Sequence, residues 1–431
     1  MKTQAPRIQL LLTGDEIMSG DTVDSNSAMI AQRLGEYGLS VYRKVTVGDD
    51  RQLLQDELRA LSQEADILIV NGGLGPTVDD LTAEVLAAAA GCKIIENPAA
   101  RAHIEQWCAR RNLDLNAANL KQAMLPSGAA IIDNPIGSAV GFQLLLNDCL
   151  VMCTPGVPSE LRAMMDTVLA NIEQRLGSFQ PVHTLRLQTF GLGESSAQQL
   201  ISDAGIEWPA GVELGFRAGA PQMEIKIGIS DPALEPQQQK CREQLETLFG
   251  DHIIGEGDST LAERVITLLS AQGQTLTTAE SCTGGLIASM LTRVPGASSA
   301  FHAGFVTYAN DIKHSVLGVP TDILEAQGAV SEAVVIAMAE GALEKSGADY
   351  AIAVSGIAGP DGGSPDKPVG TVWLAAGRRG QIKTRGLCWP VERSLFQTMV
   401  AAAGLDMIRR QLLGVEGEPL YFAQRSQKLT S

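Results

Sequence analysis

Short apolar runs that alternate with amphipathic stretches constrain the fold of this chain more than any other feature. In the first third, residues 8–12, 39–46 and 66–70 have the length and residue types of buried strands, and helical patterns cover 26–37 and 50–60. Strands that alternate with helices usually form a parallel sheet with helices on both faces. The pattern therefore predicts an α/β domain, in which ligands bind beyond the carboxyl ends of the strands.

The middle section has a different character. Residues 184–190, 211–216 and 222–229 have strand patterns, and two helical stretches accompany them. This arrangement predicts a small α+β domain of antiparallel strands and two helices. The segment 250–258, rich in Gly and Asp, would link this domain to the last section.

The last section begins at Thr260 and again alternates strands with helices. Strands are predicted at 275–278, 303–308, 350–355 and 370–376, and helices at 261–272, 331–346 and 393–413. A chain of 431 residues is expected to hold two to four domains. We predict domains over 1–177, 178–255 and 256–415, and a polar, frayed tail over 416–431.

Charge and cysteine content exclude several classes of function. The formal net charge of −16 argues against tight nucleic-acid binding, which requires clusters of Lys and Arg that this chain lacks. Seven Cys residues without a Cys-X-X-Cys pair are typical of reduced core thiols in the cytoplasm. The first apolar run is too short to cross a membrane. We therefore expect a cytoplasmic protein with no direct nucleic-acid or membrane binding.

A Gly-rich loop follows the third predicted strand. It reads Asn71-Gly72-Gly73-Leu-Gly75-Pro-Thr77. Glycines let the backbone approach a ligand closely, and the N–H groups of the helix that follows favour an anion. Asp79 and Asp80 could bind a divalent metal that bridges phosphates, although Asp80 could equally cap the helix.

Acidic and amide side chains also follow the first strand. Thr13-Gly-Asp15-Glu16 ends that strand, and Asp24 and Asn26 come soon after. Carboxylates at several strand ends of one sheet converge on one crevice, so metal-assisted attack on a diphosphate is one interpretation. Solvated acidic loops are the other.

A second candidate site begins at Glu280-Ser281-Cys282-Thr283-Gly284-Gly285, a predicted strand-to-helix turn. Ser281 could attack a substrate if a base removes its proton. His302 and His314 stand in no recognisable triad context, whereas Lys313 could act as the base in a partly desolvated pocket. Ser281 could instead cap the helix, and Lys313 could be a solvated surface residue.

Other groups could complete this second site. Tyr308 precedes Lys313 by five residues and could relay a proton. The loop Ser355-Gly356-Ile-Ala-Gly359-Pro-Asp-Gly-Gly363 offers backbone N–H groups to an oxyanion or a phosphate. Arg393 could clamp a phosphate. Cys282 is an alternative nucleophile, and Ser298 and Ser299 are alternative hydroxyls.

These motifs resemble those of the CinA family of competence/damage-inducible proteins. Thr13-Gly-Asp-Glu-Ile, the loop that starts at Asn71 and Thr154-Pro-Gly-Val-Pro are similar to the N-terminal domain of the family, which itself resembles molybdopterin-binding proteins. Ala279-Glu-Ser-Cys-Thr-Gly-Gly, Val354-Ser-Gly-Ile-Ala-Gly-Pro-Asp-Gly-Gly and Lys367-Pro-Val-Gly-Thr-Val resemble the C-terminal domain, a nicotinamide-nucleotide amidohydrolase. The likeness covers almost the whole chain.

The resemblance implies a fold and two activities. The fold would be a three-layer α/β molybdopterin-binding-like domain, a small α+β KH-like domain and a C-terminal α/β deamidase domain. The deamidase would convert nicotinamide mononucleotide to nicotinate mononucleotide and ammonia without a cofactor. The N-terminal domain would be an ADP-ribose pyrophosphatase that depends on a divalent metal.

The resemblance also implies roles for single residues. Ser281, Tyr308 and Lys313 match catalytic positions. The expected substrate-binding residues are Thr283, Gly284, Gly285, Ser298, Ser355, Gly356, Gly359 and Arg393. The expected N-terminal ligand site comprises Asp15, Glu16, Asn26, Gly72, Gly73, Gly75 and Thr77, with Asp79 and Asp80 as metal ligands.

In the expected reaction, Lys313 takes the proton of Ser281, the serine attacks the carboxamide, and backbone donors near Ser355 and Gly356 hold the oxyanion. The chain departs from the family pattern at two places. Ser355 stands where Thr is usual, and Phe396 and Gln397 stand where a second Arg often follows Arg393.

Two other functions remain open on the sequence. The chain could be a non-catalytic partner of competence or recombination proteins, or a molybdopterin-binding protein. The presence of both Ser281 and Lys313 favours the enzyme. We also expect a homo-oligomer, a dimer, that acts on small nucleotide substrates.

Overall fold

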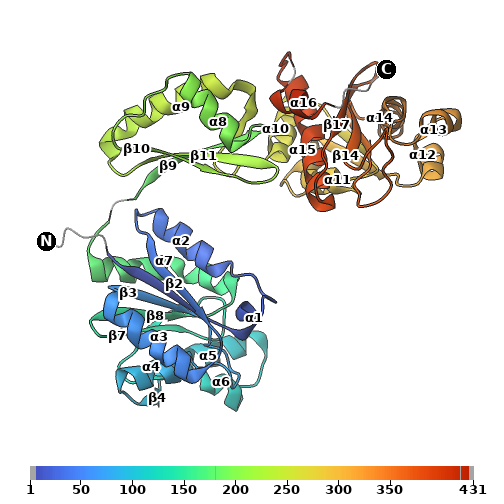
Figure 1. Cartoon of the computed structure of the whole chain (residues 1–431). Helices are drawn as coiled ribbons and strands as arrows, with labels where there is room; N and C mark the ends of the chain where they lie inside the picture. Colours follow the sequence, from blue (N-terminus) through green and yellow to red (C-terminus); the bar gives the residue numbers. More distant parts are fainter. Residues whose placement is uncertain (1–5, 180, 418, 427–431) are drawn as a thin grey trace. The chain divides into compact units, whose positions relative to one another are not determined.

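The structure is a computed structural model that describes residues 6–179, 181–417 and 419–426. The chain divides into two compact units, residues 1–183 and 184–431, and each contains layers of helices and strands (Figure 1). The first unit contains the range 1–177, for which the first domain is predicted. The middle and last sections, predicted as separate domains, lie together in the second unit. Among the described residues, no helix has the length and apolar character needed to span a membrane.

The first unit is built on a six-stranded sheet of order β2-β1-β3-β8-β7-β6. Its strands are β1 (Ile8–Thr13), β2 (Val41–Val47), β3 (Ile67–Asn71), β6 (Ala130–Ile132), β7 (Gly141–Leu146) and β8 (Cys149–Thr154). The strands β2, β1, β3 and β8 are parallel, as the sequence predicted. The strands β7 and β6 are antiparallel additions at one edge. Asn147 and Asp148, both with positive φ, form the tight turn between β7 and β8.

Helices cover both faces of this sheet (Figure 1). Alternate residues of β1 face opposite layers: Leu11 packs in the core beneath α3 (Arg51–Glu64) and α4 (Thr82–Ala90). Leu10 packs in the other core, beneath α2 (Asn26–Gly35) and α7 (Pro158–Leu176). Both faces of the central strands are therefore buried, and only the loops at the strand ends remain to form a site.

The middle section forms a four-stranded antiparallel sheet of order β10-β11-β9-β12, with α8 and α9 on one face (Figure 1). Its elements are β9 (His183–Phe190), α8 (Glu194–Asp203), β10 (Val212–Arg217), β11 (Gln222–Ile229), α9 (Glu235–Phe249) and β12 (Ile253–Glu256). The antiparallel strands and two helices agree with the prediction. The segment 250–258 is more than a linker, because β12 pairs with β9.

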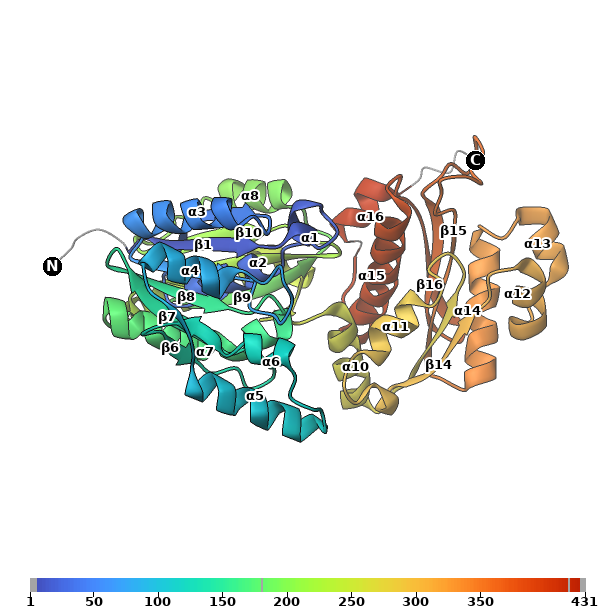
Figure 2. The same cartoon turned by 90° about the horizontal axis from the view of Figure 1, so that it is seen from below.

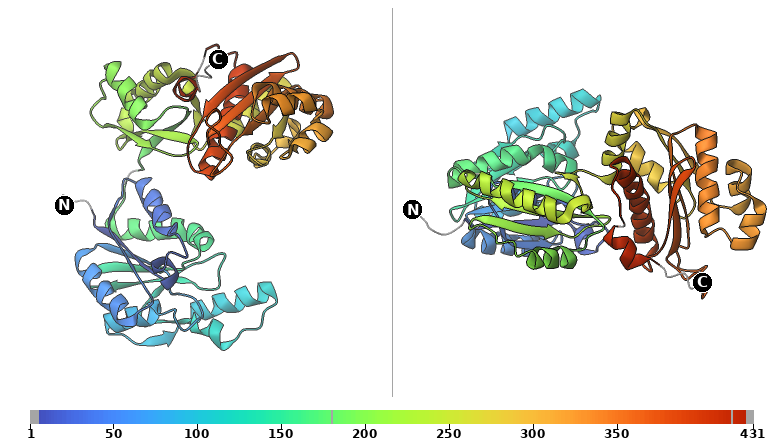
Figure 3. Two further views of the ribbon diagram at one scale, coloured as in Figure 1. Left: turned by 45° about the vertical axis from the view of Figure 1, so that its right-hand side comes forward. Right: turned by 90° about the horizontal axis from the view of Figure 1, so that it is seen from above.

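The last section is a five-stranded sheet of order β14-β13-β15-β16-β17 between two helical layers (Figures 2 and 3). The strands are β13 (Leu276–Glu280), β14 (Phe301–Val306), β15 (Tyr350–Gly356), β16 (Thr371–Arg378) and β17 (Gln381–Cys388). One layer contains α10 (Leu261–Gln272), α11 (Leu286–Thr292) and α15 (Arg393–Leu412). The other contains α12 (Asn310–Leu317), α13 (Thr321–Gln327) and α14 (Glu332–Ser346).

The expectation of a frayed tail is wrong for the part of it that the structure describes. Residues Leu420–Arg425 form the helix α16, and Tyr421 and Phe422 are buried in the core of the last section. The Tyr421 ring packs edge-on against Phe190, with 4.9 Å between ring centroids, and its hydroxyl donates to Asp406 over 3.0 Å. Two large aromatic side chains outweigh the polar composition around them. The positions 418 and 427–431 lie outside the described residues.

Candidate active site

Ser281 and Lys313 meet at the carboxyl edge of the last sheet. Ser281 follows β13 directly, and its backbone N–H donates to the carbonyl of Val354 on β15 over 3.1 Å. Lys313 lies on α12, and its Nζ is 3.0 Å from Ser281 Oγ. The pairing that the sequence suggested is therefore present in the fold. The prediction of a solvated Lys313 is excluded, because its side chain is 1% exposed.

The surroundings of Lys313 suit a base. Its Nζ donates to the carbonyl oxygens of Thr307 and Tyr308, both over 2.9 Å. Burial lowers the pKa of the Lys313 side chain from its ordinary value of 10.5. A neutral amine has two N–H groups and one lone pair. In the structure Nζ also lies within donor distance of Ser281 Oγ, at 3.0 Å. When the amine is neutral, its two N–H groups can donate to the two carbonyls, and its lone pair can then accept from the Ser281 hydroxyl.

Glu280, which the sequence did not single out, organises the turn beside Ser281. Its carboxylate is fully buried and accepts four hydrogen bonds of 2.7 to 3.0 Å. The donors are the Thr283 hydroxyl and the backbone N–H groups of Gly285, Ile287 and Ala288. A carboxylate at this place satisfies the free N–H groups at the start of α11 and complements its dipole. The signal was a Glu within one turn of a predicted helix start.

The backbone conformation of this turn explains its two glycines. Gly284 and Gly285 have φ of 62° and 98°, values that L side chains rarely adopt. Thr283 was predicted to bind substrate, but its hydroxyl already donates to Glu280 over 2.7 Å and its side chain is buried. Only the backbone of Thr283 is left to contact a ligand.

Tyr308 and Arg393 lie together at the rim of the site. Arg393 begins α15, and its guanidinium donates to the Tyr308 hydroxyl over 3.2 Å and to the carbonyl of Gly359 over 2.7 Å. Both side chains are exposed. Tyr308 touches Lys313 through its carbonyl, and its hydroxyl is paired with Arg393 instead of with Ser281. This arrangement favours a role in holding a substrate group at the rim.

In the loop after β15, the Ser355 side chain and the Gly356 backbone are both closely packed within the fold. The Ser355 hydroxyl donates to the carbonyl of Ala329 over 2.7 Å and is buried, so it is not a free donor. A Cβ on Gly356 would lie 2.9 Å from both the carbonyl oxygen of Thr371 and the side chain of Val372. Glycine is needed there for close packing against β16. The Ser355 hydroxyl is therefore already engaged within the fold. The backbone oxyanion donors expected near these two residues stay a prediction.

The prediction that Ser298 and Ser299 lie near Ser281 is wrong. They belong to a short turn, Ala297–Ser299, just before β14. The strands β13 and β14 run parallel, with Leu276 paired to Phe301. Ser298 therefore lies at the amino edge of the sheet and Ser281 at the carboxyl edge, roughly 16 Å apart at 3.3 Å per residue.

Cys282 is a poor alternative nucleophile. Its side chain is buried, and this burial raises the pKa of the thiol to about 12. A thiol with that pKa holds almost no thiolate at neutral pH. All seven cysteines are free, and five of them are buried, as expected for core thiols.

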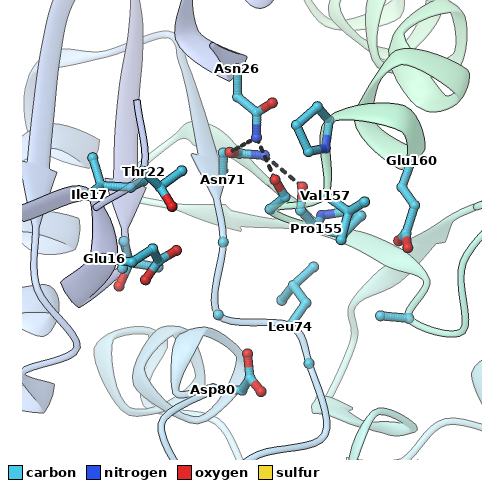
Figure 4. Close-up of a pocket in the computed structure, with 18 of the residues that line it drawn as sticks. Glu16, Ile17, Thr22, Asn26, Asn71, Leu74, Asp80, Pro155, Val157 and Glu160 are labelled. Carbon is cyan, nitrogen blue, oxygen red and sulfur yellow. Dashed lines mark hydrogen bonds between the residues drawn. The ribbon is translucent and has the colours of Figure 1, made fainter. Parts of the chain in front are cut away.

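The first unit holds a pocket of about 550 Å³ at the carboxyl edge of its sheet (Figure 4). Seven of the predicted ligand and metal residues line it: Glu16, Asn26, Gly72, Gly73, Gly75, Asp79 and Asp80. Asp15 and Thr77 do not. The Asp15 carboxylate accepts from the backbone N–H of Asp49 over 3.0 Å, and Thr77 donates to Asp80 through its N–H and its hydroxyl.

A network of amides forms one wall of this pocket (Figure 4). Asn26 Nδ2 donates to Asn71 Oδ1 over 2.8 Å and to the carbonyl of Gly156 over 2.7 Å. Asn71 Nδ2 in turn donates to the carbonyl of Pro155 over 2.7 Å. Among the described residues, nothing donates to Asn26 Oδ1 or to Gln122 Oε1, which are both buried at the pocket. The pocket wall therefore contains two buried acceptors without a donor among the described residues.

The charge of the pocket is negative throughout. Its charged lining residues are Glu16, Asp24, Asp49, Asp79, Asp80 and Glu160, with no Lys, Arg or His among the described residues that line it. Partial burial works to raise the pKa of Asp24, but hydrogen bonds from Ser27 and Lys44 outweigh it and lower that pKa. Asp49, Gln122 and Glu160 were missed, because only the fold brings them to the Gly-rich loop.

The predicted metal ligands Asp79 and Asp80 do not form a coordination site. Within residues 6–179, 181–417 and 419–426, no three acidic, His or Cys side chains come together in a way that could hold a metal. Asp80 instead accepts from the Thr77 N–H over 2.8 Å and so fixes the Gly-rich loop. It does not cap α4, whose N-cap residue is Leu81. These residues do not fit a resident metal.

Comparisons with known proteins agree with this division of the chain. Residues 258–412 match the family model described as CinA C-terminal domain, and residues 9–174 match that described as Probable molybdopterin binding domain. A CinA-like protein from Colwellia psychrerythraea is 50% identical over 98% of this chain and 99% of its own length. A CinA-like protein from Shewanella frigidimarina is 42% identical over 94% of this chain and 96% of its own length. A solved CinA superfamily structure from Klebsiella pneumoniae is 39% identical, covers 36% of this chain and 96% of its own, and has a TM-score of 0.35.

Proposed function

The chain belongs to the CinA family, and from this membership and the geometry of the site we propose that its last section hydrolyses the carboxamide of nicotinamide mononucleotide. The products are nicotinate mononucleotide and ammonia. The observation that carries the proposal is the contact between the buried Nζ of Lys313 and Ser281 Oγ, over 3.0 Å. A serine that is hydrogen-bonded to a desolvated lysine has the base that a nucleophile needs.

The reaction follows from this contact. The neutral amine of Lys313 accepts the proton of Ser281 while Oγ bonds to the carboxamide carbon. The lysine then gives that proton to the departing nitrogen, the C–N bond breaks and ammonia leaves. A water molecule attacks the acyl-serine, with Lys313 again as base, and nicotinate mononucleotide leaves as Ser281 regains its proton. The proposed reaction uses no cofactor. In it, the guanidinium of Arg393, which lies beside Tyr308 at the rim, attracts the substrate phosphate.

Ammonia release from nicotinamide mononucleotide by the purified chain tests the proposal. Ser281→Ala should abolish turnover, whereas Ser298→Ala, at the opposite edge of the sheet, should keep the parental rate. Equal rates for the parent and Ser281→Ala would exclude Ser281 as the nucleophile. No ammonia from the parent would favour the alternative of a non-catalytic partner protein, or the activity of the first unit.

For the first unit, we propose ADP-ribose pyrophosphatase activity as a second function. The pocket of about 550 Å³ beside the loop 72–75 supports it, because nucleotides bind at the carboxyl edge of such sheets. The acidic lining repels a diphosphate unless cations accompany it. AMP release from ADP-ribose should therefore require added Mg²⁺ or Mn²⁺ and should fall in Glu16→Gln, but not in Glu64→Gln outside the pocket. Release without divalent ions would contradict this argument.

A further inference from the structure

Two backbone N–H groups next to Ser281 donate to no oxygen of the residues that the structure describes. In the turn 281–284, the Gly284 N–H donates to the Ser281 carbonyl over 3.1 Å, and the Ser281 N–H donates to Val354. The N–H groups of residues 285, 287 and 288 donate to Glu280. Among the described residues, no oxygen accepts from the N–H of Cys282 or of Thr283. Adjacent N–H groups at the centre of such a turn form a concave site for an anionic oxygen.

Gln397 fixes the direction of one of these N–H groups. Gln397 lies one turn after Arg393 on α15, and its Nε2 donates to the carbonyl oxygen of Cys282 over 2.8 Å. The carbonyl of Cys282 and the N–H of Thr283 belong to one planar trans peptide, so they point in opposite directions. The bond from α15 holds the carbonyl on the helix side. The Thr283 N–H is therefore directed away from α15 and cannot rotate without breaking that bond.

We propose that the N–H groups of Cys282 and Thr283 bind the oxyanion of the reaction at Ser281, and that Gln397 is the positioning residue for this oxyanion hole. The proposal rests on the proposed amide hydrolysis. When Ser281 Oγ bonds to the carbonyl carbon, the π electron pair moves to the carbonyl oxygen, and the proton goes to Lys313. That oxygen returns its pair when the C–N bond breaks, so the two N–H groups are needed only while the negative charge exists.

This assignment differs from the backbone donors that the sequence suggested near Ser355 and Gly356. The hydroxyl of Ser355 itself donates to the carbonyl of Ala329. It also accounts for Gln397 at a place where the family often has Arg. Because Gln397 Nε2 donates to the carbonyl of Cys282, this side chain orients the Cys282 peptide and does not bind the phosphate of the substrate. Cys282 would then donate as the residue after the nucleophile does in other serine hydrolases with a strand-to-helix nucleophile turn.

The decisive variant is Gln397→Glu, which keeps the shape of the side chain but removes its N–H donors. The matched control is Gln411→Glu on the same helix, because Gln411 Nε2 donates to the Ala376 carbonyl over 2.9 Å, away from the turn. An oxyanion hole acts in the transition state, so kcat for nicotinamide mononucleotide should fall about 10- to 100-fold in Gln397→Glu with KM unchanged. Gln397→Lys, which restores a donor, should recover part of kcat. The control should keep the parental kcat.

Two results would overturn the proposal. One is a kcat for Gln397→Glu within twofold of the parent. The other is a rise in KM at constant kcat, which would place Gln397 in substrate binding. Circular dichroism and thermal melts of each variant establish that the fold is intact. A merely structural role would lower the melting temperature in parallel with kcat and would not be rescued by Gln397→Lys.

A fluorophosphonate probe separates this proposal from the proposed substrate. Its phosphoryl oxygen occupies the oxyanion position when Ser281 attacks phosphorus and fluoride leaves. If the parent is labelled at Ser281 but releases no ammonia, the substrate assignment fails while the oxyanion hole stands, provided that Gln397→Glu is labelled more slowly than Gln411→Glu. Equal labelling rates would overturn the hole. A parent that is not labelled and releases no ammonia would overturn both.

Discussion

Lys313 Nζ lies 3.0 Å from Ser281 Oγ although 32 residues separate the two positions along the chain. The contact depends on the fold at both ends. Ser281 is fixed where β13 ends, and α12 presents Lys313 under the carbonyls of Thr307 and Tyr308. Both carbonyls are backbone groups that directly follow β14. The position of the Lys313 Nζ atom therefore depends on the sheet as well as on α12.

The pH dependence of the reaction should report Lys313. Burial lowers the pKa of Lys313 below 10.5, and only the neutral amine can accept a proton. The value of kcat/KM should therefore rise with pH through that lowered pKa and then level off. Lys313→Arg, which keeps the charge but cannot lose it, should reduce kcat/KM by about 10²- to 10⁴-fold at every pH. Rates of ammonia release between pH 6 and pH 10 check both statements.

The lowered pKa of Lys313 should also make the stability of the fold depend on pH. Between the lowered pKa and 10.5, the folded chain binds fewer protons at Lys313 than the unfolded chain does. The free energy of unfolding should therefore increase with pH in that window. Lys313→Met should show a smaller increase over the same window in urea titrations. An increase equal to that of the parent would mean that the pKa of Lys313 is not lowered.

The strands that carry the site, and the pairing of Ser281 with Lys313, could be predicted from the sequence alone. The parallel strands of both sections were predicted correctly, because a buried parallel strand is a short apolar run between helical patterns. The antiparallel strands β6, β7 and β17 were not predicted. Ser281 stood out as a hydroxyl in a Gly-rich turn. Ser298 was misplaced because its neighbourhood depends on the direction of β14 relative to β13, which spacing along the chain does not contain.

Other residues act only through tertiary contacts. Gln397 and Glu280 look like ordinary helix and strand-end residues until α15 and α11 pack beside the turn. Tyr421 and Phe422 were assigned to a polar tail because their partners, Phe190 and Asp406, are distant in sequence. The turn of Asn147 and Asp148 was a readable hairpin signal that marked the antiparallel edge of the first sheet.

Replacement of Glu280 should weaken both the fold and the reaction. Glu280→Gln turns one acceptor oxygen into a donor that faces the N–H groups of α11. Loss of these charge-assisted bonds in a fully buried place should lower the free energy of unfolding by about 3 kcal/mol. Because Ser281 is the next residue, kcat should fall as well. Urea unfolding of Glu280→Gln beside the exposed-site control Glu263→Gln measures the effect, and an equal stability of the two variants would refute it.

A buried ionic cluster joins the middle sheet to the last helices. Asp406, 1% exposed, accepts from Arg409 over 2.8 Å, from Arg410 over 3.0 Å and from the Tyr421 hydroxyl over 3.0 Å. Both arginines also reach Asp251, next to β12. Asp406→Asn should cost about 3–5 kcal/mol, because it leaves buried guanidinium groups without their shared counter-ion.

Tyr421→Phe provides the comparison for this cluster. It removes one hydroxyl and keeps the ring against Phe190, so it should cost only about 1 kcal/mol. Thermal melts of the full chain rank the two variants. If Asp406→Asn melts no lower than Tyr421→Phe, the cluster does not stabilise the second unit through charge.

Gln9, unlike Asp406 and Tyr421, is a native residue that should reduce the stability of the fold. It lies on β1 and is fully buried, and neither Oε1 nor Nε2 has a hydrogen-bond partner among the described residues. An amide buried without partners costs about 1–3 kcal/mol, and Met has a similar volume. Gln9→Met should therefore raise the free energy of unfolding by about 1–2 kcal/mol. Gln52→Met on the exposed face of α3 should change it by less than about 0.5 kcal/mol. A loss of stability in Gln9→Met would mean that a buried water satisfies the amide of Gln9.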